Sequence, residues 1–314
     1  MQPPANQDSK TPTGMIQPAQ PPAGRPLRRR LGACSGHAAS PRLEAAAALI
    51  GDESQAVRRA LSDEFGQAGS DGERLLRRAS RSNDARIRSH ARALLDGRVW
   101  NAGRLRFLRY AMRSKINLEA GLWRLSSLER PGFDARPYRK ALDAMAREIV
   151  KRSAHLADPL ERGKVLVDYL GLELGYSGDM ESYSSPDNVY LHRVIERKLG
   201  LPLSLSALYS FVARRAGLRT GIVPLPGHVM LRLYGLRENL IIDPFHGGET
   251  RTQESLRAYL AEHGLRFKPL WFRSAPDGDL LRRQVANLKN ALYCTGQSTR
   301  ARRLDTVLDM AGGR

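Results

Sequence analysis

The sequence predicts an α+β protein that is mostly helical and contains one small antiparallel sheet. From residue 41 to about residue 215, apolar residues recur at the three- and four-residue spacing of amphipathic helices. Between residues 220 and 242 this spacing changes to two, with β-branched residues and glycine-containing turns typical of adjacent strands. The apolar fraction of 41% is enough for a real core.

The chain has 314 residues and a formal net charge of +19. Eight of the 51 basic residues are lysine, so the excess charge comes from arginine. Apart from the run Arg28–Arg30, the arginines are spread along the expected helices, which favours a generally basic surface. A nucleic-acid or other polyanion partner stays open on charge alone, because the sequence has neither RNP-type aromatic motifs nor a zinc-finger pattern.

The two cysteines, Cys34 and Cys294, lie far apart and outside any CxxC or His-rich pattern. This spacing predicts no disulfide framework, no metal site and no cofactor, and it fits a reducing compartment. The N-terminus lacks the charged start and apolar run of a secretory signal, and no stretch reaches the ~18 apolar residues of a membrane span. We therefore expect a cytoplasmic protein without a membrane partner.

Residues 1–40 are rich in Pro, Gln, Ala, Gly and Ser and have few aliphatic side chains to bury. Ordering such a segment costs conformational entropy with little apolar burial in return. The composition predicts a disordered basic tail, in which Met15 is an alternative start to Met1.

Residues 41–98 are expected to form a separate helical layer. The segment from Ser54 to Arg58 is similar to the segment from Asp84 to Arg88, thirty residues further along. Each is a polar or acidic turn, then a β-branched residue, then arginine, at the start of a helix. This pattern resembles HEAT-type repeats, in which stacked helix pairs bury each other's apolar faces. An irregular helical subdomain is the alternative, and either one would present a surface to a protein partner.

Two further helical regions flank the central part of the chain. Residues 99–160 predict a helical linker layer, and residues 276–314 leave room for one or two C-terminal helices. We find no catalytic constellation in the linker layer. Asp134, Asp143 and Glu148 are expected to be solvated or helix-pairing charges.

Residues 161–275 form the expected core. A helix from Glu161 ends at the glycine-rich stretch after Leu174, and Pro202 opens a second helix that ends before Gly217. The second helix is predicted to be buried. Its apolar stripe consists of Leu205, Leu208, Val212 and Ala213.

The expected hairpin places a histidine beside an aspartate. If its turn is centred on Gly235 and Leu236, the strands pair Met230 with Ile241 and bring His228 opposite Asp243. Directly opposed residues have Cβ atoms about 5 Å apart on one face of a sheet. We therefore expect the imidazole and the carboxylate to be hydrogen-bonded neighbours.

A histidine oriented by an aspartate is the base half of a nucleophilic triad. Ser204 and Ser206, at the start of the buried helix, are the candidate nucleophiles because helix N-termini favour developing negative charge. The alternatives are that Ser204 caps the helix, that Ser206 packs within it, and that His228 only ties two strands together. With Asp243, these are the candidate catalytic residues.

Other polar residues near this region are expected to have structural roles. His246 lies three residues after Asp243, but its spacing matches no zinc-ligand pattern. His192 is expected to be a surface or packing residue. Asn188 and Tyr183 lie in a loop expected to cover the cleft, where substitution would disturb folding more than chemistry.

Six sequence blocks together resemble the transglutaminase-like superfamily, and more closely its SirB-type bacterial branch of regulators with transglutaminase-like and TPR parts. The resemblance covers about residues 105 to 275. The blocks are YSSPDN from Tyr183, RVIERKLG from Arg193, LPLSLSA from Leu201, VARRAGL from Val212, PGH from Pro226 and IDPFHGG from Ile242.

The resemblance implies a papain-like core of a helix on a small sheet, with His228 and Asp243 matching the catalytic His and Asp of transglutaminases. Where the active enzymes have cysteine, this chain has Pro202 or, with a shift, Ser204. The resemblance therefore implies a non-catalytic regulatory or protein-interaction module. A Ser-His-Asp hydrolase or acyl transferase is the alternative, and a polyanion binder is the third reading.

Overall fold

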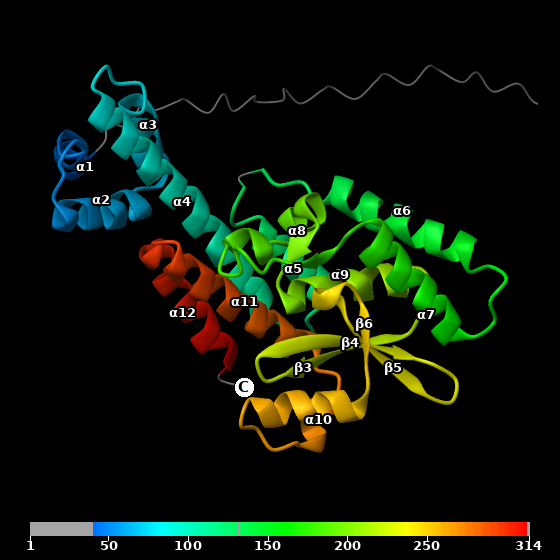
Figure 1. Cartoon of the computed structure of the whole chain (residues 1–314). Coiled ribbons are helices and arrows are strands. Elements are labelled where there is room, and N and C mark those ends of the chain that lie inside the picture. Colours follow the sequence, from blue (N-terminus) through cyan, green and yellow to red (C-terminus); the bar gives the residue numbers. More distant parts are fainter. Residues whose placement is uncertain (1–39, 131, 313–314) are drawn as a thin grey trace, which may run out of the picture. The chain divides into compact units, whose positions relative to one another are not determined.

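The computed structural model describes residues 40–130 and 132–312, and these residues belong to one compact unit (Figure 1). The predicted tail therefore lies outside the described residues, except for Ser40, and so do Arg28–Arg30 and Cys34. The architecture agrees with the prediction of a mostly helical α+β protein with a small antiparallel sheet. None of the helices in the described ranges combines the length and apolar character that a bilayer crossing requires.

Four helices come first, and their starts follow the sequence signals. Ser54 is the N-cap residue of the second helix, and the Asp84 side chain caps the fourth by accepting from the amides of Arg86 and Ile87. The helices are α1 (Pro41–Ala48), α2 (Gln55–Gln67), α3 (Gly69–Ala79) and α4 (Ala85–Ala111). Because α4 continues to residue 111, no change of element marks the boundary predicted at residue 98.

Four helices and a π-helical segment lead into the core. They are α5 (Leu118–Ser126), α6 (Arg136–Arg152), α7 (Pro159–Val167), the π-helix Asp168–Glu173 and α8 (Leu191–Arg197). The helix predicted from Glu161 to Leu174 is thus α-helical only in its first part. Two short strands that the sequence did not reveal, β1 (Ser177–Gly178) and β2 (Leu199–Gly200), pair in parallel.

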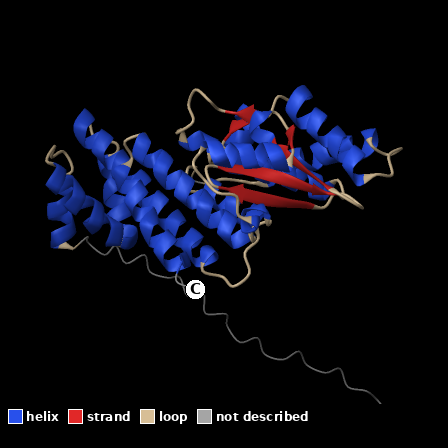
Figure 2. Cartoon of the chain, turned by 60° about the horizontal axis from the view of Figure 1, so that its bottom comes forward, coloured by secondary structure: helices blue, strands red, loops and turns tan. Residues whose placement is uncertain are grey.

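The main sheet has four antiparallel strands in the order β3-β4-β5-β6. The strands are β3 (Thr220–Leu225), β4 (His228–Tyr234), β5 (Asn239–Asp243) and β6 (Glu249–Arg251). Figure 2 shows these strands gathered in one part of the chain, among helices. The period-two pattern correctly predicted the first three strands.

Alternation along the strands gives the sheet two apolar faces, each covered by a different helix. Val229 and Leu231 belong to the large core around α9 (Pro202–Arg215), whose residues 202–213 are all buried. Val223 and Met230 pack with Leu256 of α10 (Gln253–Glu262) in a separate small cluster. Figure 1 shows α9 and α10 on opposite sides of the sheet. Helices α11 (Asp277–Cys294) and α12 (Ser298–Gly312) complete the chain.

Candidate functional site

His228 and Asp243 meet at one end of the sheet. His228 is the first residue of β4, Asp243 is the last residue of β5, and His228 Nε2 lies 2.9 Å from Asp243 Oδ1. The histidine donates this hydrogen bond, because a carboxylate oxygen can only accept. The predicted neighbours are therefore in contact.

The predicted strand register is wrong by two residues. β4 and β5 pair Leu231 with Ile242, whereas the turn centred on Gly235 and Leu236 would have paired Leu231 with Leu240. The actual loop is longer, and the amide of Gly235 donates to the carbonyl of Glu238. A shift of two residues keeps each side chain on the same face of the sheet. His228 and Asp243 are therefore diagonal neighbours instead of directly opposed ones.

The Asp243 carboxylate is buried and fully engaged. Oδ1 also accepts from the amide of Phe245 at 3.2 Å, while Oδ2 lies 2.8 Å from His246 Nδ1 and 3.5 Å from Arg251 Nη2. Burial by itself would raise the pKa of Asp243, but the hydrogen bonds and charges of His228 and His246 outweigh it and lower the pKa to about 2. The side chain is consequently ionised at neutral pH.

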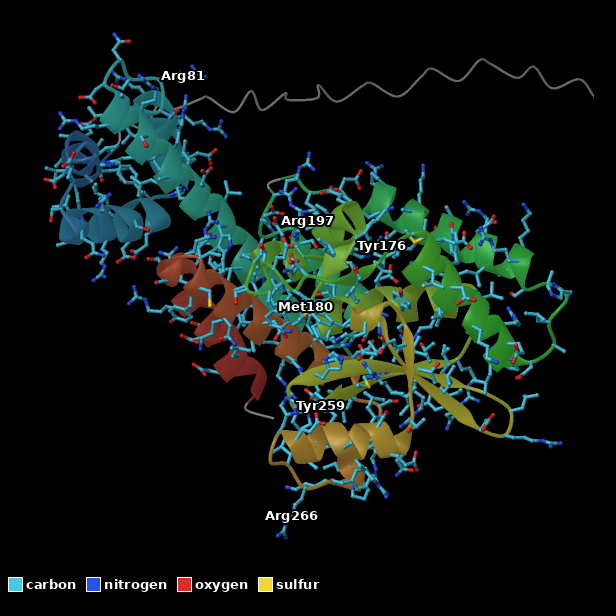
Figure 3. All side chains as sticks on the ribbon, viewed as in Figure 1. Arg81, Tyr176, Met180, Arg197, Tyr259 and Arg266 are labelled. Atoms are coloured by element: carbon cyan, nitrogen blue, oxygen red, sulfur yellow. The ribbon has the colours of Figure 1, made fainter. Side chains whose placement is uncertain are left out.

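These residues open into a cavity of about 300 Å³ between the sheet end and α10. Tyr259 of α10, labelled in Figure 3, lines this cavity. Its ring centroid lies 6.1 Å from that of His228. The His246 ring lies 5.8 Å from the His228 ring. The lining residues are His228, Met230, Asp243, His246, Arg251, Ser255, Leu256, Ala258, Tyr259 and Glu262.

The histidine and the two candidate serines lie on different sides of the sheet. His228 has the same strand parity as Met230 and lines the cavity against α10, whereas Val229 packs toward α9. Ser204 and Ser206 are buried within α9. The sheet therefore lies between the His228–Asp243 pair, called the dyad below, and α9, the helix from which a nucleophile was expected.

Both serine hydroxyls already have hydrogen-bond partners. Ser204 Oγ donates to the carbonyl of Asn188 at 2.7 Å and accepts from Gln284 Nε2 at 2.8 Å. Ser206 Oγ donates to the carbonyl of Val229 at 3.2 Å. Within the part of the chain that the structure describes, no hydrogen bond joins either serine to His228.

The alternative in which Ser204 caps its helix is wrong. The N-cap residue of α9 is Leu201, and Ser204 lies inside the first turn. Its hydroxyl instead links α9 to α11 through Gln284 and to the loop before α8 through Asn188. Cys294 is exposed at the C-terminal end of α11 and is not among the residues that line the cavity beside His228.

Asn188 holds together the loop that precedes α8. Its side chain is fully buried, donates to the carbonyl of Ser182 at 2.7 Å and accepts from Arg197 at 2.8 Å. Its own carbonyl accepts from the amide of Leu201 at 3.1 Å. Tyr183 is 47% exposed, and its ring packs edge-on against Phe245. The loop thus contacts Phe245, two residues after Asp243.

Close backbone contact fixes the turn that carries His246. Gly171 of the π-helix packs so tightly that an added Cβ would lie 2.1 Å from the carbonyl oxygen of Gly247. Gly247 and Gly248 both adopt positive φ angles, of 66° and 92°, which glycine tolerates without steric cost. Sequence reasoning noted these glycines only as part of a family block and missed the π-helix against them.

Arg283 of α11 is another residue that sequence reasoning missed. It donates to the carbonyls of Leu225 and His228, each at 3.0 Å, and so fixes the turn between β3 and β4. α10 was missed too, although Thr252 as its N-cap, the pair Leu256 and Leu260, and Gly264 after its end are ordinary helix signals.

A metal ion would have to compete with the existing hydrogen bonds. His228, Asp243 and His246 have ligand-type atoms within 4.8 Å of one another, and they are the candidate ligand group among the residues that the structure describes. Both imidazoles, however, direct a nitrogen at the carboxylate at 2.8–2.9 Å. Coordination through these same nitrogens would require each of these bonds to be given up.

His192 is a packing residue, and it is buried. Its ring contacts those of Phe133, Tyr138 and Tyr190. Nε2 lies 2.6 Å from Glu129 Oε2, at an angle that does not make a hydrogen bond. The pKa of Glu129 would be raised by burial, but His192 and Arg193 lower it to about 2. This cluster joins α8 to the segment after α5.

Comparison with known proteins supports the class of protein that the fold and the His228–Asp243 pair indicate. Residues 136–286 match the transglutaminase-like superfamily, so the chain contains a transglutaminase-like domain. The match includes His228, Asp243 and both serines.

The chain is also similar to proteins named UPF0162. The one from Xylella fastidiosa (strain 9a5c) is 43% identical over 30% of this chain and 34% of that protein. The one from Vibrio cholerae is 30% identical over 44% of this chain and 52% of that protein. Mouse F-box only protein 21 is 29% identical over 29% of this chain but only 16% of its own length. The chain thus spans about a third of the first of these two bacterial relatives and about half of the second, and no solved structure matched it.

Proposed function

We propose that this transglutaminase-like protein is a non-catalytic regulatory or protein-interaction module of the SirB type. Partner binding is assigned to the HEAT-like helical layer, and the core serves as its scaffold. The proposal rests above all on one observation: the dyad faces α10, while both candidate nucleophiles are buried on α9 with their hydroxyls engaged elsewhere.

The dyad has a structural purpose under this proposal. The bonds from His228, His246 and the Phe245 amide to Asp243 tie the ends of β4 and β5 to the turn after β5. Buried polar groups that are fully hydrogen-bonded favour one arrangement of a core over its alternatives. Intact His228 and Asp243 are therefore compatible with the absence of catalysis.

The alternative is a Ser-His-Asp hydrolase or acyl transferase that uses Ser204 or Ser206. The observation in its favour is the low pKa of Asp243. The carboxylate is therefore ionised, and its negative charge would stabilise an imidazolium on His228 during proton transfer. It requires a rearrangement that frees a serine from its carbonyl partner and brings it within about 3 Å of the imidazole.

A fluorophosphonate probe separates the two readings. We expect the full-length protein to remain unlabelled under conditions that label a known serine hydrolase. Labelling that Ser204→Ala or Ser206→Ala removes, and that His228→Ala also removes, would establish the hydrolase. Labelling that all three variants retain would come from an unrelated residue and would leave the proposal standing.

Polyanion binding is the third proposal and is supported by the net charge of +19. Such binding is electrostatic and weakens steeply with salt. Its test is the mobility of a duplex DNA of unrelated sequence at low and physiological salt. An unshifted DNA at low salt would remove this function.

A further inference from the structure

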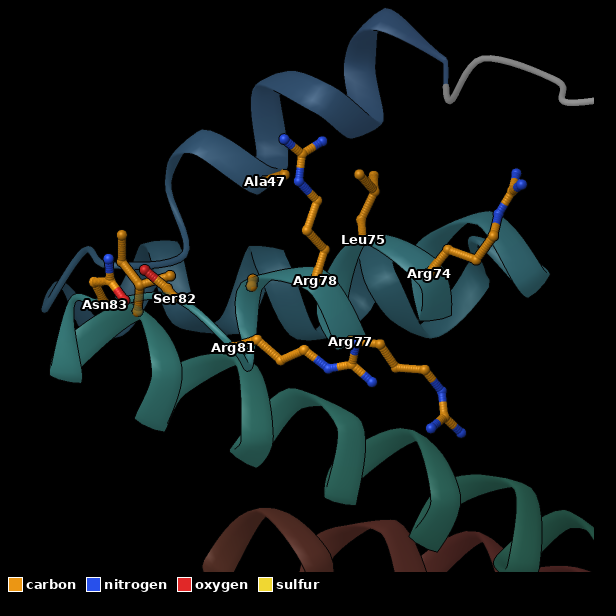
Figure 4. Close-up of a pocket in the computed structure, with 10 residues that line it drawn as sticks. Ala47, Arg74, Leu75, Arg77, Arg78, Arg81, Ser82 and Asn83 are labelled. Atoms are coloured by element: carbon orange, nitrogen blue, oxygen red, sulfur yellow. The ribbon is translucent and has the colours of Figure 1, made fainter.

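The surface of the N-terminal helices has a hollow of about 860 Å³ in which arginines surround apolar side chains (Figure 4). It lies between α1, α3 and the start of α4. In Figure 4, the Arg78 and Leu75 side chains point toward α1, while those of Arg77 and Arg81 point the other way. We call this feature the arginine hollow; its main lining residues are Ala47, Leu75, Arg77, Arg78, Arg81 and Ile87.

The charge in the arginine hollow is unbalanced. Its lining contains four arginines and no carboxylate. Arg77 pairs with Glu73 at 2.7 Å, on the same helix. Arg78 and Arg81 are exposed, and neither side chain pairs with a carboxylate among the residues that the structure describes. Two guanidinium groups are thus available to an anionic partner.

The hollow also has apolar side chains between the arginines. Leu75, Ala79 and Ile87 are half-buried, as is Ala47 of α1. A nucleic-acid backbone is bound through its phosphates and needs no such apolar surface. An amphipathic helix, in contrast, places an apolar stripe in a groove and its charged residues against the groove's rim.

We propose that the arginine hollow binds an acidic amphipathic helix of a partner protein. Its apolar stripe contacts Leu75, Ala79 and Ile87, and its carboxylates pair with Arg78 on the side toward α1 and with Arg81 on the opposite side. The inference rests on the proposed interaction role and specifies the chemistry of the partner. Guanidinium groups suit this task because they pair with carboxylates in a two-pronged geometry.

The test uses the full-length protein and a fluorescein-labelled synthetic peptide of about 20 residues, a length at which an isolated helix becomes stable. The peptide consists of Glu, Ala and Leu, with Leu repeating at three- and four-residue spacing. A second peptide has the same composition in an order that scatters Leu around the helix. Fluorescence anisotropy gives both affinities at physiological salt.

Two charge-reversal variants serve as a matched pair. Arg78→Glu with Arg81→Glu changes the hollow, and Arg58→Glu with Arg59→Glu makes the same net change at exposed positions on α2. We expect the first variant to lower affinity about tenfold or more and the second less than about threefold, because exposed ion pairs act locally under screening. We also expect the ordered peptide to bind about tenfold more tightly than the scrambled one.

Equal losses in both variants would overturn the proposal, because they would show attraction to overall charge. Equal binding of both peptides would overturn it too, and duplex DNA competing equally well would identify a polyanion surface instead. Circular dichroism of each variant ensures that a loss of binding does not reflect unfolding. A negative binding result does not change the outcome of the fluorophosphonate labelling. The two experiments therefore distinguish an error in the proposed binding site from an error in the proposed non-catalytic role.

Discussion

Replacing Asp243 by Asn removes one buried negative charge and almost no volume. The carboxylate is 1% exposed and accepts from His228, His246 and the Phe245 amide. An amide has one accepting oxygen, and its NH2 group would face a donor. We therefore expect Asp243→Asn to destabilise the protein and to change how its stability depends on pH.

The magnitude follows from the pKa of Asp243. A pKa lowered from 3.8 to about 2 corresponds to about 2.4 kcal/mol of stability at 1.36 kcal/mol per pKa unit. A depressed pKa means that this contribution is fully present above the unfolded-state pKa and is lost as the pH falls through the folded-state pKa. The cost of Asp243→Asn should thus be about 2 kcal/mol at pH 7 and about half of that near pH 3.

Urea unfolding at pH 7, 5 and 3 measures this cost directly. Asp96→Asn is the matched control, because Asp96 is exposed on α4 and its replacement should change stability by less than about 0.5 kcal/mol. A difference between wild type and Asp243→Asn that is the same at pH 5 and pH 3 would refute the reasoning. So would an unchanged stability at pH 7, since the carboxylate would then not be stabilised by its partners.

Two further substitutions, each with a comparison variant, test the supports of the site by thermal or urea unfolding. Asn188→Ala should lower the free energy of unfolding by about 2–4 kcal/mol, because it leaves buried donors and acceptors without partners. Tyr183→Ala should lower it less, because Tyr183 is half-exposed. Equal losses in the two variants would contradict this difference. Gly171→Ala should destabilise strongly, because its Cβ would collide with the carbonyl oxygen of Gly247. Gly97→Ala, in an open position on α4, should instead stabilise by about 0.5–1 kcal/mol, and a stable Gly171→Ala variant would disprove the close contact.

Local sequence determined most of the longer elements of this protein. Helix starts at Ser54 and Asp84, the buried helix after Pro202 and the strands from Thr220 to Asp243 all follow from capping residues and hydrophobic period. These signals act over a few residues, so they can be read without knowing the fold. The pairing of His228 with Asp243 was also predictable, because a register error of two residues leaves both side chains on one face.

The tertiary structure decided what surrounds that pair. Alternation along β4 shows that His228 and Val229 point to opposite faces, but it does not say which face α9 covers and which α10 covers. That choice depends on contacts between residues far apart in the chain. The Ser204 hydroxyl is likewise bound by residues far away in the chain. Its partners are Asn188 and Gln284, which come from two other elements. Sequence alone could therefore propose a triad, while packing separates the serines from the histidine.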